Sequence, residues 1–219
     1  MTVKFNQYWR IDPEKVPEYE KYLLTKFIPG VNHLGIHVVA GWVVLVGGYS
    51  EILCEGITTD LHLLEQALTH PKYKELNSEL LNCTKNYKTK VLVSSGRKDA
   101  YSKDIKTSTI KFTQAWDVVS RKSGGYEKFA TESFYPCLEE LGIKVAGEWE
   151  VIIGDGPRII CEGRVEEAHT LLENLQSAKF QKARKDMKQF VENYESRILT
   201  FHIQKMEGYK SQSYQFVAG

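Results

Sequence analysis

The strongest constraint on the fold is that the chain repeats itself. The hexapeptide KFNQYW begins at Lys4 and KFTQAW begins at Lys111, an offset of 107 residues. The alignment continues without a gap to Leu92 and Leu199, and 28 of its 89 positions are identical. The phrases ILCEG and IICEG fall in the same register. Such self-similarity indicates an internal duplication, so we expect two domains of one fold.

The length of the chain fits this division. It has 219 residues, and single domains usually contain about 100 to 150. We place the first repeat at residues 1–95 and the second at residues 110–204. Residues 96–109 are polar and lack an apolar period, as is typical of a linker. Residues 205–219 lie outside both repeats as a C-terminal tail, which we expect to cover a strand edge or a pocket mouth.

Each repeat shows the same order of predicted elements. In the first repeat, residues 3–11 alternate between apolar and polar side chains, which indicates a strand. Asp12 and Pro13 then favour the start of a helix, and Pro29 is expected to stop it. In the second repeat this helix opens with SRKSGGYE, so we expect it to begin later or to fray.

The rest of the repeat completes an α+β domain. A second strand at residues 35–46 leads through a glycine-containing turn into the ILCEG strand, which makes a hairpin. A second helical region and a final strand, YKTKVLV, follow. The order is βαββαβ, the arrangement of ferredoxin-like domains.

A sheet of this kind carries helices on one face only, so its other face must be covered, and a second copy can cover it. With its duplicated order and the segments RIDPEKVPEYEKYL (10–23) and WVVLVGG (42–48), the chain resembles the dimeric α/β-barrel superfamily. That superfamily includes small cofactor-free monooxygenases, EthD-like and NIPSNAP-like proteins, and the haem-containing chlorite dismutase group. The resemblance implies two tandem ferredoxin-like domains in a dimeric α/β-barrel type arrangement, formed within one chain or between chains. It implies no particular reaction, because members share a frame rather than a catalytic motif.

Composition argues against several partners. Lys and Arg total 29 against 28 for Asp and Glu, so no strong field attracts nucleic acid or an anionic membrane. The most apolar run, residues 34–48, is shorter than the roughly 20 residues of a membrane helix. The first residues lack the apolar core of a signal peptide. Four Cys without CxxC spacing resemble neither a zinc site nor a disulfide framework. We therefore predict a cytoplasmic protein.

Gln and Trp residues on the strands are the predicted ligand-binding residues. Strand parity assigns them to the helix-covered face, and the resemblance implies that ligands lie between helices and sheet. Such a site would take a small apolar or aromatic molecule, with the polar groups orienting it. The alternative is that these side chains are simply packed core. The six residues are Gln7, Trp9, Trp42, Gln114, Trp116 and Trp149.

The repeated ILCEG phrase supplies the predicted catalytic carboxylates, Glu55 and Glu162. Parity points them away from the helices, and a buried carboxylate there could act as a general base. The alternative is exposure at a strand end, or pairing with a basic residue such as Arg10, Lys90 or Lys144.

Two histidines complete the candidates. His37 is the third catalytic candidate, because we expect it on a strand facing the barrel interior and the second repeat has no equivalent His. No histidine spacing supports metal binding by a helix, so we predict no metal. The resemblance to chlorite dismutase proteins implies haem as an alternative cofactor, with His169 as its axial ligand. An equivalent His62 in the first repeat favours a structural role instead.

Three classes of function stay open. The first is a cofactor-free, monooxygenase-like enzyme, or a carrier, for a small apolar or aromatic molecule. The second is a haem protein. The third is a non-catalytic interaction module that forms a homo-oligomer through exposed strand edges. The sequence does not decide whether one repeat or both carry a site.

Overall fold

A computed structural model describes most of the chain, and no helix in that part is long and apolar enough to cross a membrane. Within the described part the chain divides into two compact units, unit 1 and unit 2. Among the described residues, unit 1 comprises 2–44, 48, 50–93, 201–206 and 213–217, and unit 2 comprises 45–47, 94–99 and 108–200. The described residues are 2–48, 50–99, 108–206 and 213–217.

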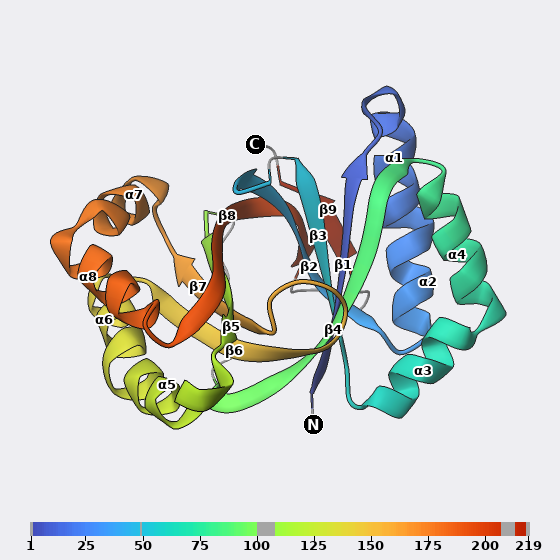
Figure 1. Ribbon diagram of the computed structural model, residues 1–219. Helices are drawn as coiled ribbons and strands as arrows, with labels where there is room; N and C mark the ends of the chain where they lie inside the picture. Colours follow the sequence, from blue (N-terminus) through green and yellow to red (C-terminus); the bar gives the residue numbers. More distant parts are fainter. Residues whose placement is uncertain (1, 49, 100–107, 207–212, 218–219) are drawn as a thin grey trace. The chain divides into compact units, whose positions relative to one another are not determined.

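Unit 1 is built on an antiparallel sheet with the strand order β2-β3-β1-β4. Helices α1 to α4 lie along one side of these strands (Figure 1). The strands are β1 (Val3–Ile11), β2 (His37–Val46), β3 (Glu51–Thr58) and β4 (Thr84–Asp99). The helices are α1 (Val16–Tyr22), α2 (Ile28–His33), α3 (Leu61–Thr69) and α4 (Pro71–Leu81).

Unit 2 repeats this plan with the strand order β6-β7-β5-β8. The predicted α+β class with two ferredoxin-like βαββαβ repeats is therefore confirmed. The strands are β5 (Ile110–Val118), β6 (Lys144–Ile153), β7 (Ile159–Val165) and β8 (Val191–Met206). The helices are α5 (Ser123–Phe129), α6 (Tyr135–Glu140), α7 (Ala168–Gln176) and α8 (Ala178–Met187).

The ends of two long strands cross the division of the sequence into repeats. The end of β4, from Ser94, belongs to unit 2, and the end of β8, from Phe201, belongs to unit 1. Of the expected linker, residues 96–99 form part of β4, and residues 100–107 lie outside the described residues. Within the tail, β9 (Ser213–Phe216) pairs antiparallel with the end of β8.

The expectation that Pro29 stops the first helix is wrong. A π-helical turn at Leu23–Phe27 precedes α2, and the N–H of Ile28 bonds to the carbonyl of Leu23. The wider turn restarts the hydrogen-bond pattern, so Pro29 occupies the first turn of a new helical segment, where its missing N–H costs little. Unit 2 has the same π-helical turn at Ala130–Phe134.

The expectation of a late start for the corresponding helix of unit 2 is also wrong. A 3-10 turn at Ser120–Lys122 and α5 begin at the positions equivalent to their counterparts in unit 1. Gly125 contributes to this, because a Cβ there would lie 2.9 Å from a ring carbon of Phe190. The glycine lets the helix pack directly on that ring.

A bulge in β2, and an equivalent one in β6, changes which side chains share a face. In β2 the register shifts between Val38 and Ala40, which makes Val39 an extra residue. In β6 it shifts between Val145 and Gly147. One extra residue reverses the alternation, so every residue beyond the bulge faces the side opposite to that expected from unbroken alternation.

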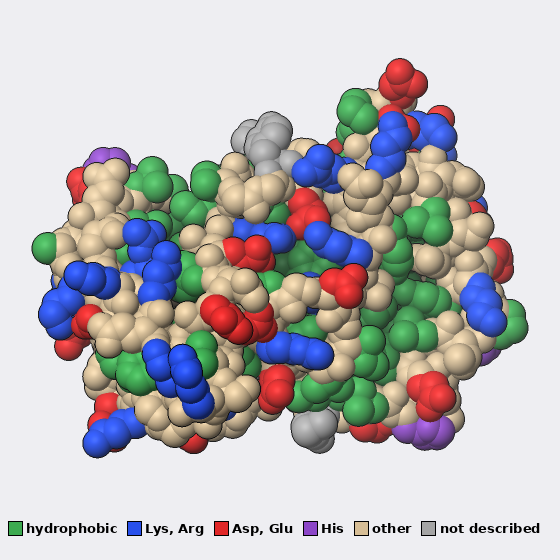
Figure 2. Space-filling model, in the orientation of Figure 1, with side chains coloured by type: hydrophobic (Ala, Val, Ile, Leu, Met, Phe, Trp, Pro, Cys, Tyr) green, Lys and Arg blue, Asp and Glu red, His purple; other side chains and the backbone are tan. Residues whose placement is uncertain are grey.

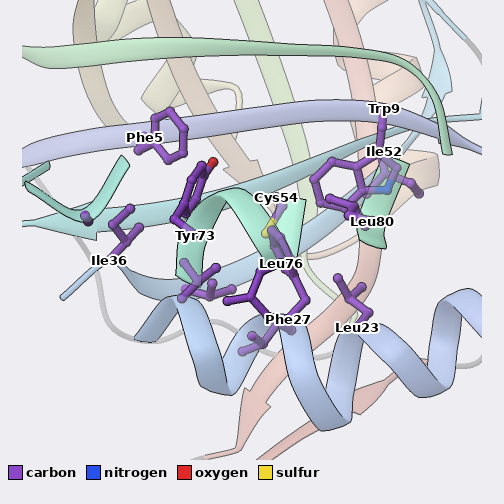
Figure 3. Close-up of a cluster of buried hydrophobic side chains, with 14 of the residues drawn as sticks. Phe5, Trp9, Leu23, Phe27, Ile36, Ile52, Cys54, Tyr73, Leu76 and Leu80 are labelled. Carbon is purple, nitrogen blue, oxygen red and sulfur yellow. The ribbon is translucent and has the colours of Figure 1, made fainter. Parts of the chain in front are cut away.

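Between sheet and helices, unit 1 has a packed apolar core, drawn in Figure 3. Trp9 and Ile52 from the strands lie close to Leu80 of α4, and Leu23 and Phe27 reach the same layer from the first helical segment. All five are at most 2% exposed.

On the face of the molecule drawn in Figure 2, acidic and basic side chains are interspersed.

Candidate functional site

A tryptophan on the first strand of each repeat anchors an aromatic cluster under the helices. Trp9 donates its Nε1–H to the hydroxyl of Tyr19 at 3.1 Å, and Trp116 donates to Tyr126 at 3.0 Å. Both tryptophans are fully buried, as predicted for the helix-covered face. Each also stacks on a tyrosine and meets a phenylalanine edge-on, which are Tyr87 and Phe27 in unit 1 and Tyr194 and Phe134 in unit 2.

The two predicted glutamines also lie in this layer. The Oε1 of Gln7 accepts hydrogen bonds from Tyr87 at 2.9 Å and Tyr73 at 3.3 Å, and the Oε1 of Gln114 accepts one from Tyr194 at 2.5 Å. Among the described residues, neither Nε2 has a hydrogen-bond acceptor. Each unit therefore holds a buried amide donor in apolar surroundings, which is costly unless a partner is supplied.

Unit 2 adds a buried carboxylate to its cluster. Glu148 is 1% exposed, and the bulge in β6 turns it toward the helices, opposite Cys161. Its Oε1 accepts from Arg97 Nε at 2.5 Å, and its Oε2 accepts from the Tyr126 hydroxyl at 2.8 Å. The Arg97 guanidinium also lies 5.3 Å from the centre of the Tyr126 ring. These donors occupy about half of the lone pairs of the carboxylate.

Burial and this carboxylate set the charge states of the neighbouring groups. Burial raises the pKa of Tyr126, and the Glu148 carboxylate raises it further, so the phenol stays a donor at neutral pH. Burial alone would lower the pKa of Arg97, but Glu148 raises it above its ordinary value. Burial raises the pKa of the Cys161 thiol well above its ordinary value, which disfavours a thiolate.

Unit 1 replaces the carboxylate with a histidine from another strand. Gly41 takes the position of Glu148, and a Cβ there would lie 3.3 Å from Ile203 of β8. The Tyr19 hydroxyl lies 3.3 Å from His202 Nε2, and the two rings stack at 5.9 Å. Burial lowers the pKa of His202 to about 4, so this neighbour is neutral at pH 7.

The C-terminal strand β9 adds a second layer over His202. The Phe216 ring meets the His202 ring edge-on at 5.1 Å. The Tyr214 hydroxyl donates to the Val38 carbonyl at 2.9 Å and accepts from Asn32 Nδ2 at 2.8 Å. In unit 1 the aromatic cluster is thus covered by the tail.

Trp42 and Trp149 do not lie on the helix-covered face, to which an unbroken alternation of side chains along the strand assigned them. Trp42 pairs with Leu53, and Trp149 pairs with Ile160, on the face away from the helices. The bulge in each strand reverses the alternation before the tryptophan is reached. Trp42 instead stacks on Phe201 at 4.1 Å.

The predicted catalytic carboxylates are buried and paired with lysines. Glu55 binds Lys4 Nζ at 2.8 Å and accepts from Trp42 Nε1 at 2.6 Å, and Glu162 binds Lys111 Nζ at 2.9 Å. All four charged side chains are at most 4% exposed. Because both repeats keep the same pair, this arrangement resembles a retained structural ion pair more than a single reactive site.

The candidate histidines lie at the surface. His37 is exposed at the first residue of β2. His169 lies on α7 with an 83% exposed side chain, 3.6 Å from Glu173, and His62 lies on α3 near Glu65. Within the described ranges, no three His, Cys, Asp or Glu side chains gather as metal ligands would. All four cysteines are free thiols.

Sequence reasoning missed Glu148, Arg97 and His202 as members of these clusters. A signal existed for Glu148, because Gly147 interrupts an apolar strand, and a glycine there often marks a bulge. No local signal existed for Arg97 or His202, which reach the clusters from the ends of β4 and β8.

Comparisons with known proteins identify the fold. The match to a candidate monooxygenase from Fusobacterium nucleatum covers 91% of this chain and 92% of that protein, with a TM-score of 0.63 and 10% identity. The match to an anthrone oxidase-like protein covers 91% of this chain and 90% of that protein, with a TM-score of 0.62 and 10% identity. The match to a candidate monooxygenase from Lactobacillus acidophilus covers 91% of this chain and 93% of that protein, with a TM-score of 0.59 and 8% identity.

These identities are low, so the likenesses show the fold alone. The shared fold is an α+β arrangement of two tandem ferredoxin-like repeats, and the resemblance predicted from the duplicated sequence is confirmed at the level of the fold. No protein-family model matches the chain, and no curated protein is significantly similar to it in sequence.

Proposed function

We propose that the protein is a cofactor-free oxygenase acting on a small aromatic ketone, with its reactive site in unit 2. The observation that carries the proposal is the buried carboxylate of Glu148, held by Arg97 and Tyr126 beneath the helices. The full-length likeness to candidate monooxygenases and to an anthrone oxidase-like protein supports the reaction class.

The proposed reaction starts with proton removal by Glu148 from an activated CH₂ group that is conjugated with a carbonyl through the flanking aromatic rings. The resulting carbanion, delocalised onto the carbonyl oxygen, supplies electrons to O₂ and forms a C–O bond. Return of the proton gives a hydroperoxide, which loses water to leave a new carbonyl. The balance is R₂CH₂ + O₂ → R₂C=O + H₂O, in which the substrate loses four electrons and O₂ gains them.

The neighbouring groups fit this chemistry. Arg97 keeps a charge beside the site, compensates the buried carboxylate and would stabilise the anionic oxygen of the deprotonated substrate. The Arg97 side chain is 20% exposed, so it marks the side of the cluster that reaches solvent. Gln114 Nε2 would donate to the second polar group of the substrate, and Trp116 offers an aromatic wall.

The first test is oxygen consumption by the purified protein with a tricyclic anthrone. We expect equal molar amounts of O₂ consumed and quinone formed without added metal, flavin or haem. Glu148→Gln should lower the rate about 10²- to 10⁴-fold, the usual contribution of a positioned general base. Glu150→Gln, at an exposed carboxylate of the same strand, is the matched control and should keep the wild-type rate.

Loss of folding must be separated from loss of the base. Glu148→Gln leaves Arg97 without its carboxylate, which can destabilise a buried site by several kcal/mol. The double variant Arg97→Gln/Glu148→Gln removes both charges together and is expected to fold but stay inactive. Full activity in either folded variant would refute the role of Glu148.

The other candidates remain predictions. Catalytic roles for Glu55, Glu162 and His37 would be tested with the same assay, after substitution by Gln in each case. Haem as the alternative cofactor, with His169 as its ligand, would be tested by titrating haem into the wild type and His169→Ala and following the Soret band.

A further inference from the structure

A solvent-open hollow of about 680 Å³ lies in unit 1, where the end of α2 meets the start of α4. The two helices pack on one another there (Figure 1). A hollow of this volume is large enough for a small molecule of one or two rings. Its lining combines apolar and basic residues, which are Pro29, Gly30, His33, Leu34, His70 and Lys72.

His33, His70 and Lys72 bring hydrogen-bond donors to the lining of the hollow. His70 caps α4, and its Nδ1 accepts the backbone N–H of Lys72 at 3.0 Å. The neutral imidazole therefore carries its proton on Nε2, which is a donor. The Lys72 ammonium pairs with Glu75 at 2.9 Å, but both side chains are about half exposed, and such surface pairs are weak.

The second repeat has an ion pair between the two helices that correspond to α2 and α4. The offset of 107 residues places Lys179 at the position of Lys72 and Glu140 at the position of His33. In unit 2, Lys179 and Glu140 form an ion pair between α8 and α6. The lysine of unit 2 is thus paired with a carboxylate of the same unit. Unit 1 has a third basic residue, His33, at the position of that carboxylate.

We propose that the hollow of unit 1 binds a small molecule that carries a carboxylate on an apolar ring. The carboxylate takes the position against Lys72 that Glu140 takes against Lys179, with His33 and His70 as further donors. The ring lies on Pro29 and Leu34. None of the lining residues belongs to the cluster around Glu148, so this site does not depend on the proposed oxygenase reaction.

The test is a calorimetric titration of the full chain with 1-naphthoate. We expect one saturable site, weakened at least 10-fold by Lys72→Met and by His33→Glu. The second variant restores the carboxylate that unit 2 already tolerates, so it is expected to fold. Lys74→Met, at an exposed lysine of the same helix, is the matched control and should leave the affinity unchanged.

Two further probes separate the parts of the proposal. The neutral 1-naphthalenemethanol and inorganic phosphate should each bind at least 5-fold more weakly than 1-naphthoate. Equal binding of the alcohol would overturn the role of the carboxylate, and equal binding of phosphate would overturn the role of the apolar ring. Absence of saturable naphthoate binding, or unchanged affinity in both His33→Glu and Lys72→Met, would overturn the site itself.

Discussion

The two repeats share the same aromatic cluster under the helices. They differ in the group that the hydroxyl of its central tyrosine contacts besides the tryptophan. Trp9–Tyr19 and Trp116–Tyr126 have the same hydrogen bond, within 0.1 Å in length. Tyr19 then meets the neutral ring of His202, whereas Tyr126 donates to the carboxylate of Glu148. The duplication has kept the groups that pack and changed the partner of the tyrosine from a neutral imidazole in unit 1 to a carboxylate in unit 2.

This difference explains why one unit is proposed to react and the other is not. In unit 1 the position of the carboxylate is Gly41, and the space beside it is filled by Ile203. The cluster is further covered by Phe216 of β9. Unit 1 therefore serves as an internal control, because it keeps the aromatic cluster and lacks the carboxylate that is proposed as the base.

The largest expected effect tests the shared aromatic cluster. Trp9→Ala and Trp116→Ala should each lower the free energy of unfolding by about 3–5 kcal/mol, since each removes a fully buried ring. Urea denaturation followed by far-ultraviolet circular dichroism measures both. A cost below about 1 kcal/mol for either would show that the two aromatic clusters are not equivalent.

The next effect is a pH dependence confined to unit 1. Burial lowers the pKa of His202 to about 4. Below the ordinary histidine pKa of about 6.5, the unfolded chain takes up a proton that the folded chain accepts only near pH 4. The free energy of unfolding therefore falls through this window as pH drops, by about 3 kcal/mol in total.

His202→Gln removes this titration. Urea unfolding at pH 7 and pH 4.5 should show a smaller acid loss of stability in the variant than in the wild type. An identical loss in both proteins would mean that His202 titrates normally in the folded state.

A smaller effect, on rate, separates the two tyrosines. Tyr126→Phe removes the hydrogen bond that orients the Glu148 carboxylate, and the loss of this positioning should lower kcat for oxygen consumption by up to roughly 100-fold. Tyr19→Phe, its counterpart in unit 1, should change kcat by less than about 2-fold. Similar losses in the two variants would contradict a single reactive unit.

The smallest effect concerns the tail. Tyr214→Phe removes the hydrogen bonds to Val38 and Asn32 but keeps the ring, so the free energy of unfolding should fall by about 1 kcal/mol. Hydrogen exchange at the amides of β9 should become faster. Unchanged exchange would show that these bonds do not hold the tail.

The sequence predicted the fold and half of the aromatic cluster. The duplication and the order of elements sufficed for the class, and strand parity placed Gln7, Trp9, Gln114 and Trp116 correctly on the helix-covered face. These residues lie on first strands, whose alternation is unbroken as far as the tryptophan.

The remaining residues depend on features that no local pattern reveals. A one-residue bulge moved Trp149 away from the helices and turned Glu148 toward them. Arg97 and His202 enter the clusters from strand ends 51 and 183 residues distant from their partners. The lysines that pair with Glu55 and Glu162 lie on neighbouring strands, and register rather than composition selects them.

The most direct test of the central claim is anaerobic hydrogen–deuterium exchange at the activated CH₂ of an anthrone in D₂O, followed by NMR. Without O₂, only the proton-transfer step is observed. The account predicts that the wild type accelerates exchange at least 100-fold over Glu148→Gln, and that Tyr19→Phe exchanges at the wild-type rate. Equal exchange in the wild type and a folded Glu148→Gln variant would contradict the assignment of Glu148 as the base.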